Sequence, residues 1–124
     1  MTLKGARAIC RGRLRVVFQP HTFSRTAELF DGFVDAFANS GADEVILCDI
    51  YPARETNIYG VTSEGLADAI AAKGTHASRA ESFEAAAERM DRDAEADDLV
   101  IVMGAGDVIR VAEILKARNK KNSE

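Results

Sequence analysis

Five apolar residues follow one another without interruption in Leu99–Met103. A run of this kind is typical of a parallel strand that helices cover on both faces, because a half-solvated antiparallel strand alternates apolar and polar residues. Apolar runs in Val16–Phe18 and Glu44–Asp49 also indicate strands, and helix-like segments separate all three. The connections are too long for hairpins. The chain is therefore predicted to be an α/β protein, with a doubly wound, mostly parallel sheet and helices on both faces.

The helices are predicted from capping residues and from apolar spacing. Ser24 is the expected N-cap of a helix that runs to Ser40, and Gly41 supplies its stop signal. Further helices are expected to begin at Thr62 or Ser63 and at Ser82. The remaining expectations are a helix tail in residues 3–11, a loop over 50–61, a helix end at Gly74, an edge strand in Thr75–Arg79, an acidic turn in Asp93–Asp98 and a last helix from Asp107 to Arg118.

Length and composition restrict the class of protein. With 124 residues, 47% of them hydrophobic, residues 1–124 are expected to form a single domain. A net charge of −4 and the absence of tryptophan argue against a nucleic-acid partner. The sequence has no leader-like segment and no apolar run long enough to span a membrane, so we expect a cytoplasmic protein without a membrane partner. Cys48 is expected in the core.

Polar segments follow three of the predicted strands at their carboxyl ends. These segments are Gln19–Arg25, Asp49–Glu55 and Gly104–Asp107. Because ligands of doubly wound sheets bind outside the carboxyl ends of the strands, the three segments are expected to meet at one rim. His21 and Arg25 stand between a strand and a helix, and the guanidinium of Arg25 suits a carboxylate or a phosphate. The pair is therefore a candidate anion-binding site.

Two other motifs favour structural interpretations. Gly104-Ala105-Gly106-Asp107 lacks the third glycine of a dinucleotide fingerprint, so we interpret it as a tight turn with Asp107 as an N-cap, and a P-loop is absent. Asp49 at a strand end would suit a phospho-accepting receiver domain, but Gln19, Pro20 and His21 stand where acidic magnesium ligands would be needed. Capping and turn chemistry is the simpler explanation of Asp49. His76 is expected at the surface, and no cluster has the spacing of a metal site.

Several segments together resemble a known family. They are Val17–Thr26, Leu29–Phe33, Asp49–Glu55 and Met103–Asp107. Over essentially the whole chain, the sequence resembles the C-terminal domain of the Mur ligases that join L-alanine to UDP-N-acetylmuramate in peptidoglycan synthesis. The resemblance implies a Rossmann-like domain of a larger enzyme, which phosphorylates the lactoyl carboxylate with ATP and Mg²⁺ and forms the amide from the acyl phosphate.

The resemblance also implies roles for individual residues. His21, Thr22 and Arg25 would bind substrate carboxylate and offset its charge, and Tyr51 and Glu55 would line the same cleft. Many relatives carry arginine at the position of Thr22 and glycine at that of Arg54. The N-terminal UDP-sugar domain, the central ATPase domain that mainly holds the nucleotide and metal, and the Asp-Asp-Tyr-Gly-His-His-Pro type of segment that contacts the nucleotide are missing from this sequence. The chain is therefore expected to hold no complete catalytic site and to be inactive alone.

An alternative of another class stays open at this stage. The same α/β pattern would suit a stand-alone small-molecule-binding module or a receiver-like regulatory domain without a catalytic partner. The coding sequence upstream of Met1 distinguishes the two hypotheses, because a P-loop followed by the Asp-Tyr-His-His segment is expected there for the ligase.

Overall fold

Four strands of the described residues form one parallel sheet. The computed structural model describes residues 3–52, 54–93, 95, 97–104 and 108–122. The sheet has the order β3-β2-β1-β4, and every neighbouring pair is parallel. The strands are β1 (Leu14–Gln19), β2 (Glu44–Leu47), β3 (His76–Arg79) and β4 (Leu99–Gly104), and the helices are α1 (Leu3–Ile9), α2 (Phe23–Glu28), α3 (Phe30–Ala38), α4 (Ser63–Ala72), α5 (Phe83–Arg92) and α6 (Ile109–Asn122).

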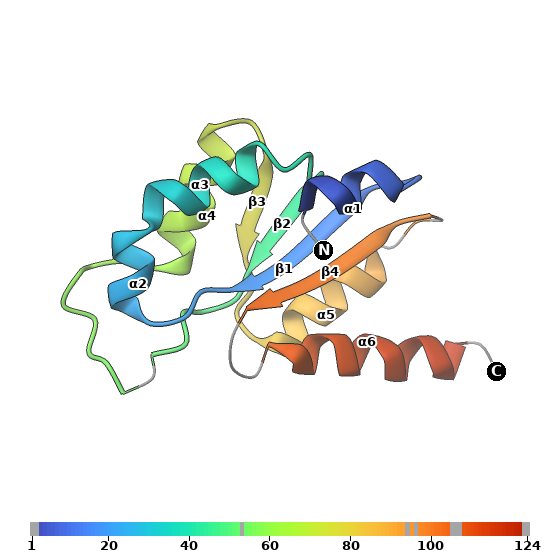
Figure 1. The fold of residues 1–124 in the computed structure, drawn as a ribbon. Coiled ribbons are helices and arrows are strands. Elements are labelled where there is room, and N and C mark those ends of the chain that lie inside the picture. The colour runs from blue at the N-terminus through green and yellow to red at the C-terminus, as the bar shows by residue number, and fades with distance from the viewer. Residues whose placement is uncertain (1–2, 53, 94, 96, 105–107, 123–124) are drawn as a thin grey trace.

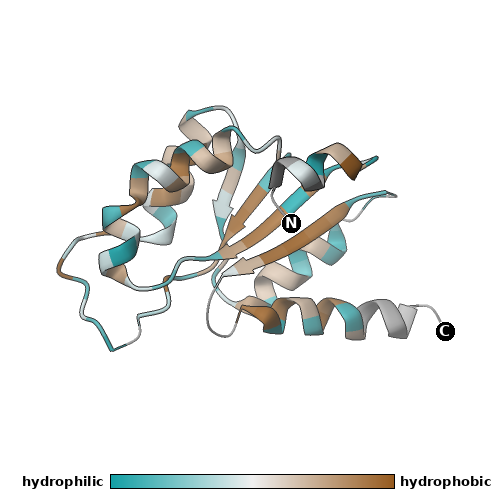
Figure 2. Ribbon diagram, viewed as in Figure 1, coloured by the Kyte–Doolittle hydropathy of each residue, from teal (hydrophilic) through white to brown (hydrophobic). Residues whose placement is uncertain are grey.

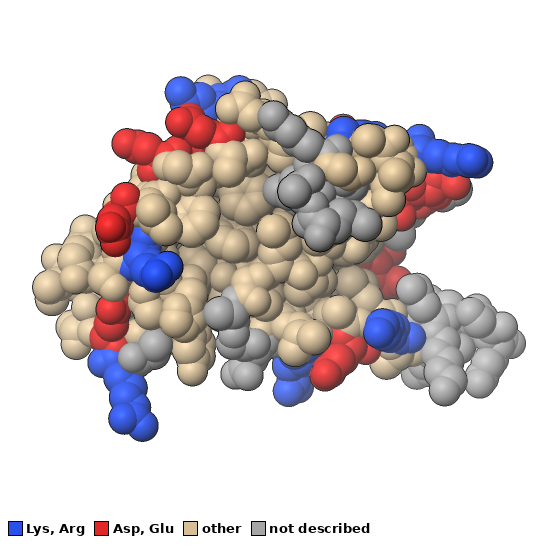
Figure 3. Space-filling view, in the orientation of Figure 1, with Lys and Arg blue, Asp and Glu red and all other residues tan. Residues whose placement is uncertain are grey.

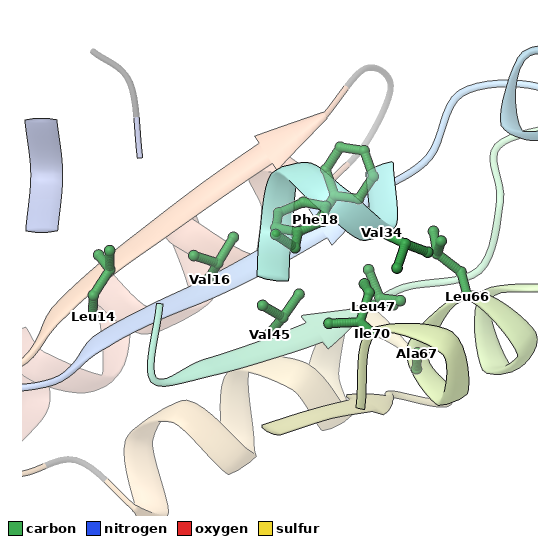
Figure 4. Close-up of a cluster of buried hydrophobic side chains, with 10 residues drawn as sticks. Leu14, Val16, Phe18, Val34, Val45, Leu47, Leu66, Ala67 and Ile70 are labelled. Carbon is green, nitrogen blue, oxygen red and sulfur yellow. The ribbon is translucent and has the colours of Figure 1, made fainter. Parts of the chain in front are cut away.

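Helices cover both faces of this sheet, which confirms the predicted doubly wound fold. Helices α3 and α4 pack on one face, and α5 and α6 on the other (Figure 1). Alternate residues of each strand feed the two cores, so Val16 faces α3 and α4 while Val17 faces α5 and α6. Figure 4 shows the first core, and Figure 2 shows that β1, β2 and β4 are apolar along most of their length, whereas β3 is paler.

The first long helix differs from its prediction in two respects. Thr22, not Ser24, is the N-cap of α2, and the Thr22 hydroxyl accepts a hydrogen bond from the Arg25 N–H at 3.3 Å. The expected helix from Ser24 to Ser40 is also interrupted at Leu29, which has φ −101° and ψ 13°. The i to i−4 hydrogen bonds continue on both sides of Leu29, so α2 and α3 follow one another end to end. The continuous ladder and apolar spacing explain why the sequence suggested one helix.

Most other predicted boundaries agree with the structure. Thr62 caps α4 and Ser82 caps α5 through their hydroxyl groups, and β3 is an edge strand. Three elements have different lengths: β1 is longer than Val16–Phe18, β2 ends at Leu47 instead of Asp49, and α6 continues beyond Arg118. The expected N-cap Asp107 lies outside the described residues.

A fully buried arginine connects three elements at the amino ends of the strands. Arg15 of β1 is 0% exposed, and its Nε donates to Glu44 Oε1 of β2 at 2.8 Å. Its guanidinium also donates to the carbonyl of Met90 at 2.9 Å, near the carboxyl end of α5. Because a helix carboxyl end is partly negative, α5 and Glu44 together compensate the buried charge.

Asp98 lies just before β4, at the same end of the sheet as Arg15. Its carboxylate accepts hydrogen bonds from the Arg13 guanidinium at 2.8 Å and from the Glu95 N–H at 3.0 Å. Burial opposes ionisation of this carboxyl, but the hydrogen bonds from Arg13 and from the backbone of Glu95 and Arg13 outweigh it and lower the pKa of Asp98. Asp98 is therefore charged in the folded chain at neutral pH.

Gly104 ends β4 in close contact with β1. It has φ +130°, and a Cβ at this position would lie 2.5 Å from the carbonyl oxygen of Gln19. Both the backbone conformation and the approach of the two strands therefore favour glycine here. Strand order reverses between β1 and β4, so this contact lies at the topological switch point of the sheet.

The surface and the helices give two further facts. Figure 3 shows acidic and basic side chains interspersed around the edge of one face, whose middle is largely uncharged. In the part of the chain that the structure describes, no helix is both long and apolar enough to cross a membrane.

Replacing Gly104 with alanine is expected to lower the free energy of unfolding by roughly 2–3 kcal/mol, because the added methyl group would push β4 from β1. Chemical denaturation of the purified chain measures this change. The matched control is Gly32→Ala in α3, where a Cβ would meet nothing within 4 Å. That variant should gain about 0.5–1 kcal/mol from helix propensity. Equal stability of Gly104→Ala and the unsubstituted chain would contradict the close strand contact.

Substituting Asp98 with asparagine is expected to cost about 1–3 kcal/mol at neutral pH, since the charge-assisted hydrogen bonds to Arg13 are lost. The lowered folded-state pKa makes this stabilisation fully present above the unfolded pKa, and it disappears as the pH falls through the folded value. The difference between the two proteins should therefore shrink below about pH 4. Thermal unfolding at several pH values tests this, with the exposed Asp97→Asn as control; a difference that stays constant down to pH 2 would refute it.

Candidate functional site

The candidate site is built on pairing between β1 and β2 that continues beyond the sheet. Past the end of β2, the Tyr51 N–H donates to the Pro20 carbonyl at 2.9 Å, and the Thr22 N–H donates to the Tyr51 carbonyl at 2.7 Å. His21 and Tyr51 form a parallel bridge, and their rings stack with centroids 5.4 Å apart and 23° between the planes. Two residues that the sequence placed on different polar segments are thus in direct contact.

Thr22 occupies a strained position between this pairing and α2. Its φ of 63° and ψ of 149° belong to a region that glycine favours and that a β-branched residue rarely adopts. Three contacts hold it there. Its N–H is bound to Tyr51, its hydroxyl caps α2, and its carbonyl accepts from the Thr26 hydroxyl at 2.7 Å. The backbone therefore turns sharply from the His21–Tyr51 pair into the helix that bears Arg25.

Arg25 lies exposed on the first turn of α2. Its backbone N–H is used by the Thr22 cap, but its guanidinium has no hydrogen bond or ion pair with any residue that the structure describes. A guanidinium presents several donors in a fixed plane and suits a bidentate carboxylate or phosphate. Arg25 is thus the candidate residue that is free to bind an anion.

Glu55 lies in the same cluster, but its carboxylate is bound within the protein. Oε1 accepts from the Ser24 N–H at 2.9 Å, and Oε2 accepts from the Ser24 hydroxyl at 2.6 Å. The hydrogen bonds from the Ser24 side chain and backbone lower the pKa of Glu55, and the charge of His21 acts in the same direction. Both carboxylate oxygens of Glu55 therefore face Ser24. The predicted contact between Glu55 and a substrate stays a prediction.

The loop between β2 and α4 carries Tyr51 and Glu55. Arg54 in this loop has φ 73°, a conformation that glycine adopts without strain. Farther along, Ile58 and Tyr59 are 78% and 50% exposed, so the outer part of the loop leaves apolar groups in solvent. Residues of this loop and the first residues of α2 and α4 line an open hollow; they are Phe23, Asp49, Ile50, Asn57, Val61, Thr62 and Ser63.

Of the third polar segment, the structure describes Gly104, which pairs with Gln19 at the same rim. Ala105, Gly106 and Asp107, which carry the predicted tight turn and its cap, lie outside the described residues. Because Gln19 directly precedes the Pro20–Thr22 segment, the switch point of the sheet and the His21–Tyr51 pair are close along the chain.

Asp49 has a different role from the expected capping. Its carboxylate binds the Arg79 guanidinium at the end of β3, with distances of 2.6 and 3.0 Å, and the helix α4 that follows is capped by Thr62. The hydrogen bond to Asp49 raises the pKa of Arg79. The expectation of turn or capping chemistry at Asp49 was therefore wrong, because an arginine from a neighbouring parallel strand lies within reach.

Two expectations outside the cluster are confirmed. The Cys48 thiol is buried, and burial together with the nearby charge of Asp49 raises its pKa to about 11. The His76 side chain is 74% exposed. Among the residues that the structure describes, no group of three His, Cys, Asp or Glu side chains could hold a metal ion.

Sequence reasoning missed the Ser24–Glu55 contact and the cap at Thr22. Ser24 and Glu55 are 31 positions apart, and no local pattern links them. Thr22 and Ser24 are both common capping residues, so residue type alone did not distinguish them. What distinguishes the two positions is the hydrogen bond from the Arg25 N–H to the Thr22 hydroxyl, which only the structure shows.

The comparisons with known proteins agree with this architecture. The family model described as "Mur ligase, glutamate ligase domain" matches residues 1–106. The chain is 44% identical over 112 residues to the UDP-N-acetylmuramate–L-alanine ligase of Clostridium botulinum (strain Eklund 17B), covering 90% of this chain and 24% of that protein. The enzyme of the same name from Clostridium perfringens (strain 13) is 41% identical over 113 residues, which are 91% of this chain and 24% of that protein.

A solved structure shows the same fold. The crystal structure of UDP-N-acetylmuramate-alanine ligase from Thermotoga maritima matches 97% of this chain and 23% of its own, with a TM-score of 0.67 and 20% sequence identity. The chain spans about a quarter of the length of the curated relatives that it matches. With its family model matched over most of its length and its fold shared with a solved member, the chain belongs to the Mur ligase family.

Proposed function

We propose that this chain serves as the C-terminal domain of an ATP-dependent ligase that joins L-alanine to UDP-N-acetylmuramate through an acyl phosphate. The observation that carries the proposal is the 44% identity, over 90% of the chain, to a ligase of that name. The proposal assigns residues 1–124 to one domain of a longer cytoplasmic enzyme of peptidoglycan synthesis. UDP-N-acetylmuramate, L-alanine and the other domains of the same enzyme are then its partners.

The site geometry supports a role in binding a carboxylate. Arg25 offers a free guanidinium, and the stacked ring of His21 lies two residues before the first turn of α2. Such groups would orient a substrate carboxylate and offset the charge that develops during amide formation, without transferring a proton. In this proposal Thr22 sets the backbone direction between them, and Tyr51 packs against His21.

The nucleotide and its metal are assigned to other parts of the enzyme. The sequence contains no P-loop, and the described residues include no group of three potential metal ligands. The proposal therefore assigns no step of the reaction to this chain through ATP or Mg²⁺. The proposed contribution of the chain is the positioning of the amino acid and the sugar-nucleotide carboxylate.

A receiver-like regulatory role receives less support. A phospho-accepting aspartate must be free to react, whereas both oxygens of Asp49 are bound by Arg79. No observation specifically favours a stand-alone small-molecule-binding module over the ligase domain.

A hybrid enzyme tests the proposed function and the role of Arg25. This chain replaces the matching quarter of the Clostridium botulinum ligase, and the hybrid should form the amide. Arg25→Ala should then lower kcat/KM for L-alanine by roughly 100-fold, because a carboxylate contact is removed from a site whose fold is unchanged. The control is Arg11→Ala, an exposed arginine just before β1. Unchanged kinetics for Arg25→Ala would remove Arg25 from the site.

The isolated 124-residue chain is expected to release no phosphate from ATP when UDP-N-acetylmuramate and L-alanine are both supplied. The physical reason is that the proposed nucleotide and metal sites belong to other domains. A coupled phosphate assay of the purified chain measures this, with the hybrid ligase as the positive control. Substrate-dependent phosphate release by the chain alone would refute the assignment of the nucleotide and metal sites to other domains.

A further inference from the structure

The contact between Glu55 and Ser24 joins two segments that carry the candidate site. Both carboxylate oxygens of Glu55 are used, one by the Ser24 N–H at 2.9 Å and one by the Ser24 hydroxyl at 2.6 Å. Both residues are half-buried. A carboxylate with two short hydrogen bonds to one residue is held in a fixed orientation, and substrate binding by it would require breaking them.

Ser24 lies next to Arg25, so its contact with Glu55 constrains the helical turn that carries Arg25. Ser24 directly precedes Arg25 in the first turn of α2, and Thr22, two residues earlier, is bound to Tyr51. The loop and the helix are thus joined twice, by Thr22–Tyr51 and by Ser24–Glu55. Two separate connections between the same segments fix their relative orientation, whereas one would leave a hinge.

Backbone strain lies beside both connections. Thr22 and Arg54 have φ values of 63° and 73°, which non-glycine residues adopt only when surrounding contacts hold them. Arg54 directly precedes Glu55, and the Glu55 N–H donates to the Pro52 carbonyl at 2.9 Å. If the Ser24–Glu55 contact were lost, the segment around Arg54 would lose one of its two connections to α2 and could relax toward an ordinary backbone conformation, whereas Thr22 would still be held by Tyr51 and Thr26.

We propose that Glu55 is a positioning residue, which binds Ser24 and thereby fixes the direction of Arg25 relative to the stacked His21–Tyr51 pair. This inference rests on the proposed function, and it replaces the expectation that Glu55 touches the substrate. The lowered pKa of Glu55 agrees with it, because the carboxylate is then charged and accepts both hydrogen bonds at neutral pH.

A double-mutant cycle in the hybrid ligase distinguishes positioning from substrate contact. Ser24→Ala and Glu55→Ala should each lower kcat/KM for L-alanine by about tenfold, and the double variant should be no worse, because all three break the same connection. Glu55→Gln should restore most of the activity, since an amide oxygen can accept from the Ser24 N–H and its NH₂ can donate to the hydroxyl. If Glu55 acted through its charge on the substrate, Gln would be as poor as Ala and the effects of Ser24→Ala and Glu55→Ala would multiply. Either result would overturn the proposal.

A measurement on the chain itself separates this inference from the proposed function. In NMR spectra, Glu55→Ala should shift the Ser24 amide and reduce the ring-current shift that Tyr51 imposes on the His21 ring protons. Glu28→Ala, at the exposed end of α2, should change neither. If Glu55→Ala leaves both signals unchanged, the inference fails even if the hybrid is active. An inactive hybrid without substitutions contradicts the proposed function alone.

The unsubstituted chain provides a second readout that does not depend on the folding of a variant. Its Ser24 amide shift should follow the titration of Glu55, with a midpoint below the ordinary value for glutamate. A Ser24 amide that does not respond to the ionisation of Glu55 would overturn the proposal.

Discussion

The candidate site depends on parallel pairing that outlasts the sheet. After the last β1–β2 register pair, the Cys48 N–H binds the Phe18 carbonyl, and the Tyr51 N–H then binds the carbonyl of Pro20. Proline cannot donate a hydrogen bond, but its carbonyl still accepts one. The segments that follow β1 and β2 therefore stay adjacent where a regular strand must end. The stacking of His21 on Tyr51 therefore follows from strand pairing and needs no separate ligand to assemble it.

The opposite end of the sheet is fixed by a buried charge. Arg15 and Glu44 are register partners of β1 and β2 as well as an ion pair, and Arg15 also binds the carbonyl of Met90 in α5. A shift of β1 by one residue would leave this guanidinium without its acceptors, and an unpaired buried charge is costly. The register that brings His21 beside Tyr51 is thus enforced at the opposite end of β1 and β2, by a contact that takes no part in the site.

Local signals made much of the fold predictable, and non-local contacts account for what was missed. The run Leu99–Met103 and the caps Thr62 and Ser82 are encoded by neighbouring residues, so the α/β class and most boundaries could be read from sequence. The ion pair of Arg15 with Glu44 joins residues 29 positions apart, and the contact of Ser24 with Glu55 joins residues 31 positions apart. No periodicity reports such pairs, so neither contact could be predicted from the sequence.

The two expected departures from the family pattern have different physical consequences. At Arg54, φ is 73°, so a glycine there, as the resemblance implies for many relatives, would adopt the same backbone without strain. The substitution therefore costs conformational energy but keeps the loop in place, because Glu55 and Tyr51 remain bound on either side. At Thr22, an arginine would bring a second guanidinium to the rim, whereas threonine brings a helix cap. Under the proposed function, this chain would have a fixed first turn where the resemblance implies a second cationic group in many relatives, and carboxylate binding would depend more on the orientation of Arg25.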